Sequence, residues 1–532
     1  MKKTLAVLLA LILASSIATG ALAETAEEGP WTFTVMASVT SDFGDLNNQW
    51  LMDKIEEEFN IIIESENVSS EGFAEKKNLA FGSGQLPDFF FGTSITPTEM
   101  ATYGAQGTLI PLEQYFTEEY MPNFMAQMEE YPEVYRAMFF PDGHAYAIWG
   151  FNPDPTQMAQ SKFWVNVDWA EEYIGKVPET VEEFYDYCVA VRDNDANGNG
   201  DPDDEYGFYG QYNSAYGGYY DGLMGLLPAF GFVDRRVQVF DGDVVLVPTH
   251  PNYKEFLKYM NRLYEEGLMN PDYFTTTEEE RIAVEASKQC GSFTDWCQWG
   301  YMTDFDDWFQ WQAIDPLTSE FNSTKMWPGV DVALTYNLCI TNKCENVEKL
   351  LELVDWFYTD EGILAEGEGP MLGEWEEYPE YGWEFVRDET GYGEFIRHWP
   401  EDSYDTWNAW HHDVVSPWMW PVGTLSDAYT NEETRYDFED PDDNLLANVE
   451  EHYVPYLKTA FPAARFTAEE SNELALITTD LNSYLDQQIT KFIIGELDID
   501  ENFDSFVEEA MAMGGTRFEE IYQTAYDRWA QN

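Results

Sequence analysis

The chain has few basic residues: 27 Lys and Arg stand against 100 Asp and Glu among its 532 residues, a formal net charge of -73. A surface of this sign repels the phosphates of nucleic acids and the anionic head groups of membranes. We therefore expect neither nucleic acid nor a membrane surface as a partner. The acidity alone names no ligand, because it also suits a solvated surface in salty surroundings.

Long apolar runs are scarce as well. After the first 23 residues, no stretch approaches the ~20 apolar residues that a transmembrane helix needs. Those first residues, MKKTLAVLLALILASSIATGALA, combine two Lys, a short apolar run and the cleavage pattern Ala21-Leu22-Ala23. This combination is typical of an export signal. We expect a soluble mature chain from Glu24, periplasmic or extracellular, in which no Cys follows the signal to carry a lipid anchor.

Only five Cys are present: Cys188, Cys290, Cys297, Cys339 and Cys344. An oxidising exterior permits a disulfide within the second and third or within the last two, and the odd number leaves at least one thiol. No pair has zinc-site spacing. A nucleophile elbow, a His-Glu-x-x-His pair and a phosphate-binding loop are also missing, so we predict that the protein is not an enzyme.

Apolar and aromatic residues are plentiful, at 44% and 16%, which predicts a folded chain, and the length favours two lobes. Residues 31–39 alternate like a strand, 51–59 have helical spacing and 61–63 form a second apolar strand, so a parallel α/β sheet is expected. The strand pattern starts afresh at 163–165, which places a crossing between lobes near residue 150. Apolar residues at helical spacing predict an amphipathic helix over 253–263.

Several segments, taken in order, are similar to those of the family 1 extracellular solute-binding proteins, the substrate-capturing components of ABC sugar importers. They are GSGQLPDFFF, GTLIPL, DGHAYAIW, FWVNVDWAEEYIGKVPETVEEFYDY, NGNGDPDDE, YMNRLYEEGLMNPDYF and NKCENVEKLLELVDWFYTDEG. Together they span residues 30 to about 365. The resemblance implies a two-lobed periplasmic-binding-protein-like fold of type II, with a ligand cleft that closes on a carbohydrate, most often a mono- or oligosaccharide.

On this basis we divide the chain into an export signal and two lobes. Residues 1–23 are the signal, 24–153 with about 326–380 form lobe 1, and 154–325 with about 381–532 form lobe 2. The expected function is to capture a carbohydrate, probably an oligosaccharide, by closure of the lobes and to deliver it to an ABC transporter permease. We expect a monomer.

Residues 193–207, DNDANGNGDPDDEYG, alternate oxygen-bearing side chains with Gly after a predicted helix. Calcium takes six to eight oxygen ligands, and a loop with oxygens at positions 1, 3, 5, 7, 9 and 12 and Gly at position 6 wraps one ion. Registers that start at Asp193 or at Asp195 fit, and the second resembles a calcium loop of some family members. We predict a structural Ca²⁺ held by Asp195, Asn197, Asn199, Asp201, Asp203 and Asp204.

Sugar sites combine aromatic rings, which stack on apolar sugar faces, with amides and carboxylates that pair with hydroxyl groups. Aromatic residues gather near the expected crossing and in the segments GGYYDG, CGSFTDWCQW and DTWNAWHHD. Core packing is the alternative for any single one of them, but we expect at least two to line the cleft. The ligand-binding candidates are Trp149, Asn152, Trp164, Tyr219, Tyr220, Phe293, Asp295, Trp296, Trp299, Trp407 and Trp410.

Two other functions remain open at this stage. The acidity fits a binding protein for a peptide or a cationic amine. A secreted glycoside hydrolase also uses paired carboxylates in an aromatic cleft. With 100 acidic residues such pairs arise by chance, so their presence does not discriminate between binding and hydrolysis.

Overall fold

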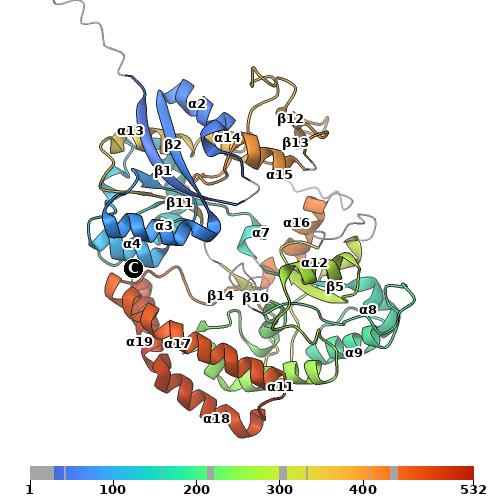
Figure 1. Ribbon diagram of the computed structural model, residues 1–532. Helices are drawn as coiled ribbons and strands as arrows, with labels where there is room; N and C mark the ends of the chain where they lie inside the picture. The colour runs from blue at the N-terminus through green and yellow to red at the C-terminus, as the bar shows by residue number, and fades with distance from the viewer. Residues whose placement is uncertain are drawn as a thin grey trace, which may run out of the picture.

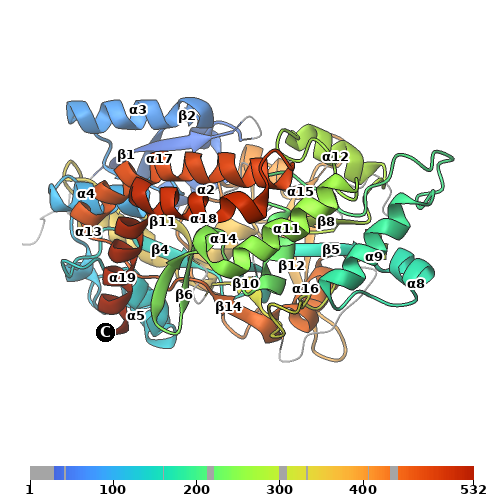
Figure 2. The same cartoon turned by 90° about the horizontal axis from the view of Figure 1, so that it is seen from below.

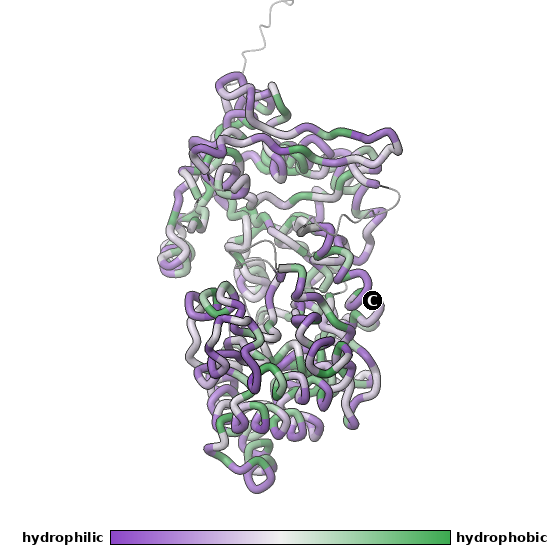
Figure 3. The backbone as a smooth tube through the Cα atoms, turned by 90° about the vertical axis from the view of Figure 1, so that its right-hand side faces the viewer, coloured by the Kyte–Doolittle hydropathy of each residue, from purple (hydrophilic) through white to green (hydrophobic). Residues whose placement is uncertain are grey.

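The computed structural model describes residues 29–531 except 41–42, 160, 213–220, 299–307, 331–333, 405 and 432–440. The described chain forms two lobes, each with its own sheet and flanking helices (Figure 1). Figure 3 shows hydrophilic stretches along the outer loops and helices of both lobes. The α/β, two-lobed fold expected from the sequence is confirmed.

Lobe 1 is built on a five-stranded sheet of order β2-β1-β3-β11-β4. Strands β1 and β2 are parallel along their whole length, and β11 is antiparallel to both of its neighbours. The strands are β1 (Trp31–Val39), β2 (Ile61–Ser69), β3 (Phe89–Phe90), β4 (Ile148–Phe151) and β11 (Leu334–Ile340). The helices around the sheet are α2 (Trp50–Phe59), α3 (Ser70–Ser83), α4 (Pro97–Ala105), α5 (Pro122–Glu130), α6 (Pro132–Ala137), α13 (Val347–Trp356) and α14 (Asp360–Gly367).

Lobe 2 contains a three-stranded antiparallel sheet of order β8-β5-β9 and a hairpin, β6-β7. The strands are β5 (Lys162–Asn166), β6 (Val237–Phe240), β7 (Asp243–Leu246), β8 (Ser292–Asp295) and β9 (Trp311–Ala313). The helices are α8 (Val167–Ile174), α9 (Val181–Arg192), α10 (Leu223–Leu226), α11 (Pro251–Glu265), α12 (Glu278–Ala286), α16 (Pro441–His452), α17 (Ala468–Ile493), α18 (Ile499–Ala510) and α19 (Thr516–Ala530).

Short elements and one long helix join the lobes. Helix α7 (Pro155–Met158) follows β4, and β10 (Trp327–Gly329) pairs in parallel with β14 (Leu457–Thr459). Helix α17 contacts α11 of lobe 2 and α4 of lobe 1, and Figure 2 shows it lying alongside α11. The C-terminal helices therefore reach both lobes.

Each lobe has a separate hydrophobic core, and these cores correct one part of the expected division. The stretch that contains Trp407, Trp410, Val415 and Trp420 belongs to the core of lobe 1, although the sequence division assigned it to lobe 2. The physical reason is aromatic packing: the Trp420 ring stacks on Phe357 with 4.8 Å between centroids. Trp327, conversely, belongs to the core of lobe 2. Helix α15 (Trp407–Trp410) begins the stretch that runs to Trp420. The hairpin of β12 (Gly382–Arg387) and β13 (Gly393–His398) comes before it in the chain.

Three of the five thiols lie in the hydrophobic cores. Cys188, Cys290 and Cys339 are buried, and no disulfide links any of the five Cys. Burial raises the pKa of each of these three thiols.

Among the described residues, no helix has both the length and the apolar composition needed to cross a membrane.

A buried carboxyl group gives lobe 1 a pH-dependent stability. Glu366 of α14 accepts hydrogen bonds from the Ser416 hydroxyl and from the Trp420 backbone N–H, the latter at 3.0 Å. Burial raises its pKa from 4.5 to about 7. Because the folded-state pKa is the higher one, the folded state binds the proton more tightly, and this stabilisation is lost as the pH rises from 4.5 through 7.

We expect Glu366→Gln to stabilise the protein by about 2 to 3 kcal/mol at pH 8 and to have little effect at pH 4.5. The amide keeps the neutral form, and it can still accept from Trp420 and donate to Ser416. Urea unfolding at the two pH values measures the difference, with Glu71→Gln on the exposed face of α3 as the control. An equal effect of Glu366→Gln at both pH values would contradict the account.

Candidate ligand-binding site

The sheets of both lobes present strand ends to the region between the lobes. In lobe 1, β1, β3 and β4 run in the same direction, and the chain crosses to lobe 2 directly after β4 ends at Phe151. In lobe 2, β5 begins at Lys162, and the last residue of β8, Asp295, lies opposite it. Ligands of open α/β sheets bind beyond the carboxyl ends of strands, so this region is the candidate site.

On lobe 1 the candidate site carries an aromatic cluster, which consists of Phe43, Trp407, His411, His412 and Trp418. The Phe43 and His412 rings are stacked with 4.8 Å between centroids, and Trp418 meets His412 edge-on at 4.7 Å. Trp418 also lies 5.7 Å from Trp407. Phe43, His412 and Trp418 are only half-buried, so part of each ring is accessible.

Backbone hydrogen bonds hold the aromatic cluster against the strand ends. The Gly92 N–H, just beyond β3, donates to the Met419 carbonyl at 2.9 Å, and the Gly44 N–H donates to the His412 carbonyl at 3.3 Å. Burial lowers the pKa of His411, so its ring is neutral near pH 7. His411 therefore contributes a neutral ring to the cluster, and the Arg397 guanidinium lies 4.6 Å from the centroid of the Trp407 ring.

On lobe 2 the candidate site centres on Trp296, which follows β8. The Lys162 ammonium group lies 3.2 Å from the centroid of the Trp296 ring and donates to the Thr156 carbonyl at 2.9 Å. Burial lowers the pKa of Lys162 to about 7. The Trp296 ring is half-buried, so this cation–π contact fixes its orientation while part of the ring stays accessible.

A buried network of ion pairs lies next to Trp296 in lobe 2. Asp295 is 4% exposed, forms an ion pair with Arg281 and accepts from the Trp296 N–H. Arg281 also binds Glu285 at 2.8 Å. Burial raises the pKa of both carboxyl groups. Asp295 thus positions the backbone of Trp296, and its carboxylate oxygens are occupied by Arg281 and the Trp296 backbone N–H.

Besides Asp295 and Trp296, the other nine predicted ligand-binding residues fall into four groups. Trp164, Phe293 and Trp410 are at most 2% exposed and pack in the cores, which leaves no ring surface for a ligand. Trp149 and Trp407 are 7% and 8% exposed. Asn152 lies at the surface after β4, where its Oδ1 accepts from the Asp154 N–H at 3.0 Å. Tyr219, Tyr220 and Trp299 lie outside the described residues.

Sequence reasoning missed Phe43, Lys162, Arg281, His412 and Trp418. Two of these had a usable signal. Phe43 follows directly after the predicted strand 31–39, where an α/β sheet places ligand-contacting loops. Trp418 lies eight residues after the chosen Trp410 in the same aromatic stretch.

The predicted calcium loop follows α9 as a compact turn. Gly198 and Gly200 have φ values of 72° and 95°, which only Gly adopts readily. The Asn199 N–H donates to the Asn197 side chain at 2.9 Å, and the Asp201 N–H donates to the Asn199 side chain at 2.7 Å. The Asp203 N–H donates to Asp201 at 3.3 Å. Side-chain oxygens therefore face the inside of the turn.

Three carboxylate oxygens in this loop are buried without a hydrogen-bond partner: one each on Asp195, Asp204 and Glu205. Glu205 was not among the predicted ligands, and burial raises its pKa, with neighbouring Asp204 and Asp195 adding to the effect. Nevertheless, no three His, Cys, Asp or Glu side chains in the described chain are gathered closely enough to form a ready metal cage. The oxygen chemistry fits calcium, and the loop would have to tighten around the ion.

A profile of the bacterial extracellular solute-binding protein family matches residues 45–363, more than half of the chain. The fructooligosaccharide ABC transporter substrate-binding protein FusA of Streptococcus pneumoniae is 24% identical over 500 residues, which cover 92% of this chain and 88% of FusA.

Two solved structures show the likeness of fold. An EF-hand mutant of S. pneumoniae FusA in complex with fructo-nystose is 23% identical, with a TM-score of 0.74 over 94% of this chain and 100% of that one. An HMO-binding, ABC-transporter-associated solute-binding protein of Bifidobacterium longum infantis is 20% identical, with a TM-score of 0.75 over 94% and 99%. The two-lobed architecture is therefore shared along nearly the whole chain.

Proposed function

We propose that this chain, which belongs to the family of bacterial extracellular solute-binding proteins, is the substrate-binding component of an ABC importer and captures an oligosaccharide between its lobes. The observation that carries the proposal is the pair of aromatic surfaces at the strand ends: the aromatic cluster on lobe 1 and Trp296 on lobe 2. The similarity to FusA, a fructooligosaccharide ABC transporter substrate-binding protein, supports it.

The mechanism follows from where the rings lie. An oligosaccharide first stacks on the exposed rings of one lobe, and contacts with the second lobe are made only when the lobes approach. These additional contacts shift the equilibrium toward the closed form. A permease then recognises the closed form. We infer that residues 1–23 direct export and that the mature protein acts as a monomer outside the cytoplasm.

A thermal-shift screen tests the ligand class. Mature protein is heated with neutral oligosaccharides, uronic-acid oligomers, short peptides and diamines, in buffer with calcium. A ligand at ~100 times its dissociation constant stabilises by about 2.7 kcal/mol, which raises the melting midpoint by about 5 °C. We expect a shift with an oligosaccharide. A shift with peptides or diamines alone would favour the other ligand classes, and shortening of the sugar would favour a hydrolase.

We also propose that the loop of residues 195–205 binds a structural Ca²⁺. The three partnerless carboxylate oxygens support this proposal, since a buried anion without a partner is costly and a cation offsets that cost. The ligands would be Asp195, Asn197, Asn199, Asp201, Asp203 and Asp204, with Glu205 added from the structure. One solved structure of FusA is an EF-hand mutant, so an EF-hand is a feature of that relative, which supports the proposal. Calcium would fix the loop after α9 and have no direct contact with the sugar.

A further inference from the structure

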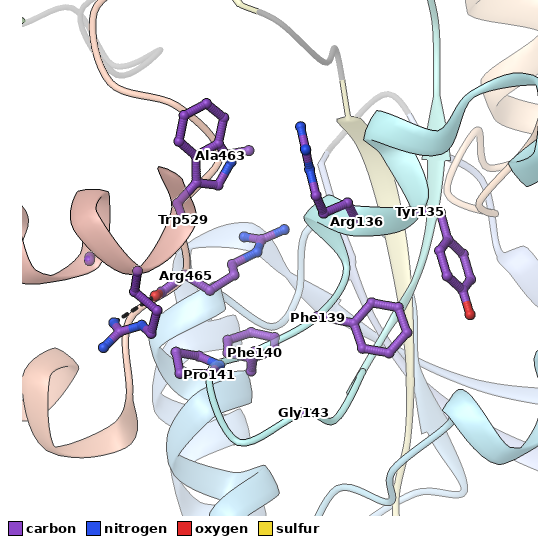
Figure 4. Close-up of a pocket in the computed structure, with 11 residues that line it drawn as sticks. Tyr135, Arg136, Phe139, Phe140, Pro141, Gly143, Ala463, Arg465 and Trp529 are labelled. Atoms are coloured by element: carbon purple, nitrogen blue, oxygen red, sulfur yellow. Dashed lines mark hydrogen bonds between the residues drawn. The ribbon is translucent and has the colours of Figure 1, made fainter. Parts of the chain in front are cut away.

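A cavity of about 430 Å³ lies between the lobes, lined by residues other than those of the aromatic cluster and Trp296. Lobe 1 contributes α6 and the segment after it, including Arg136 and Phe140. Lobe 2 contributes the segment before α17, with Arg465, and the end of α19, with Trp529 (Figure 4). The volume is that of a small-molecule site, and aromatic rings form much of its wall.

Arginine is concentrated at this cavity. Arg136, Arg465 and Arg528 line it, in a chain with only 27 basic residues, and none of the lining residues is acidic. Arg528 is already neutralised by Glu470, with an N–O distance of 2.7 Å. The Arg136 guanidinium is exposed and lies 5.6 Å from the centroid of the Trp529 ring. The cavity therefore has a net positive lining.

Arg465 is the unusual member of the three. Its Nε donates to the Ala137 carbonyl at 2.8 Å, but its Nη2 is buried without a hydrogen-bond partner. The guanidinium lies between aromatic rings, 5.3 Å from Trp149 and 5.5 Å from Phe140. Within the described chain it forms no ion pair, and burial lowers its pKa to about 10.

A guanidinium nitrogen that is buried without a hydrogen-bond partner destabilises a fold, which makes its presence on half-buried Arg465 informative in so acidic a chain. Buried Arg281 shows the usual solution, since it binds both Glu285 and Asp295. At Arg465 the described part of the chain supplies no carboxylate, and the side chain instead borders an accessible cavity. An external anion would satisfy it, and a carboxylate matches the planar guanidinium geometry.

We propose that this cavity binds a carboxylate carried on a small, flat, partly apolar molecule, with Arg465 as the anchor and Arg136 as a second cation beside Trp529. The aromatic walls accommodate the body of the ligand, and the guanidinium groups take the anion. Because both lobes form the walls, occupancy of this site is linked to the arrangement of the lobes and hence to capture at the strand ends. The site is separate from the proposed oligosaccharide site.

Titration with benzoate tests the proposal, with benzamide as the neutral probe of the same shape and glucuronate as a sugar-acid probe. Wild-type protein is expected to bind benzoate saturably, and to bind both benzamide and glucuronate, which is neither flat nor apolar, at least about tenfold more weakly. Arg465→Gln should lose at least about tenfold in affinity for benzoate, and Arg136→Gln a smaller factor. Arg517→Gln, on the outer face of α19, should bind like wild type.

Equal binding of benzoate and benzamide would overturn the proposal, because the cavity would then be merely apolar. So would the absence of saturable benzoate binding, or equal benzoate affinities in Arg465→Gln and Arg517→Gln. If Arg465→Gln fails to fold, Arg136→Gln is the variant that tests the site. The proposal is then contradicted when Arg136→Gln binds benzoate like wild type and wild type binds benzamide as tightly as benzoate. These titrations need no oligosaccharide, so their failure is distinct from failure of the proposed function.

Discussion

Trp296→Ala is expected to weaken oligosaccharide binding by at least about 30-fold, which corresponds to about 2 kcal/mol. The Trp296 ring is the aromatic surface that lobe 2 presents at the candidate site, and a sugar held on lobe 1 would lose its stacking partner across the site. The substitution also removes the ring against which the Lys162 ammonium group packs. Titration calorimetry of wild type and variant measures the difference.

Two further variants separate stacking from general disruption. Trp296→Phe retains a ring and should recover most of the affinity. Trp31→Ala lies at the opposite end of β1 from the candidate site and should bind like wild type. If Trp296→Ala folds with an unchanged melting midpoint and keeps full affinity, the oligosaccharide does not stack on this ring, and the proposed site on lobe 2 is wrong.

Removal of calcium is expected to lower the melting midpoint by about 8 °C. At ~1,000 times its dissociation constant, a bound ion stabilises the folded state by about 4 kcal/mol, and each kcal/mol moves the midpoint of a lobe of this size by about 2 °C. Without the ion, the buried oxygens of Asp195, Asp204 and Glu205 would keep no partner to compensate their charge. Differential scanning calorimetry with chelator, and then with calcium restored, measures this change.

The variant that isolates the loop is Asp195→Asn combined with Asp204→Asn. It should melt at the same temperature with chelator and with calcium, whereas Asp504→Asn, at an exposed position of α18, should respond like wild type. A wild-type midpoint that is indifferent to chelator would show that the loop is an acidic turn without a metal. Recovery with magnesium alone would contradict the choice of calcium.

Local structure was largely predictable from the sequence because it depends on short-range periodicity. The strand expected over 31–39 is β1, and the apolar positions of 253–263 are the buried face of α11. The helix after Thr180 begins there because the Thr180 hydroxyl accepts from the Glu183 N–H at 3.3 Å. Thr180 and Glu183 have the spacing of a capping box in the sequence, but the Glu183 side chain binds Lys176 instead.

The candidate site was predictable only in outline, because it depends on contacts between distant segments. Phe43 stacks on His412, and no local sequence pattern predicts a contact between residues so far apart in the chain. Trp164 and Trp296 have the same residue type, yet one is fully buried and the other accessible, and this difference is set by the packing of strands β5 and β8. For the same reason the sequence did not reveal that the stretch around Trp407 packs on lobe 1.

The central claim is that the protein holds an intact oligosaccharide between its lobes. Its most direct test is calorimetric titration of the mature, calcium-loaded protein with the oligosaccharide that gives the largest thermal shift, followed by chromatography of the recovered sugar. We predict one sugar bound per chain, with a dissociation constant in the micromolar range or below, and recovery of the sugar unchanged. No heat with any oligosaccharide, or recovery of shorter sugars, would contradict the account.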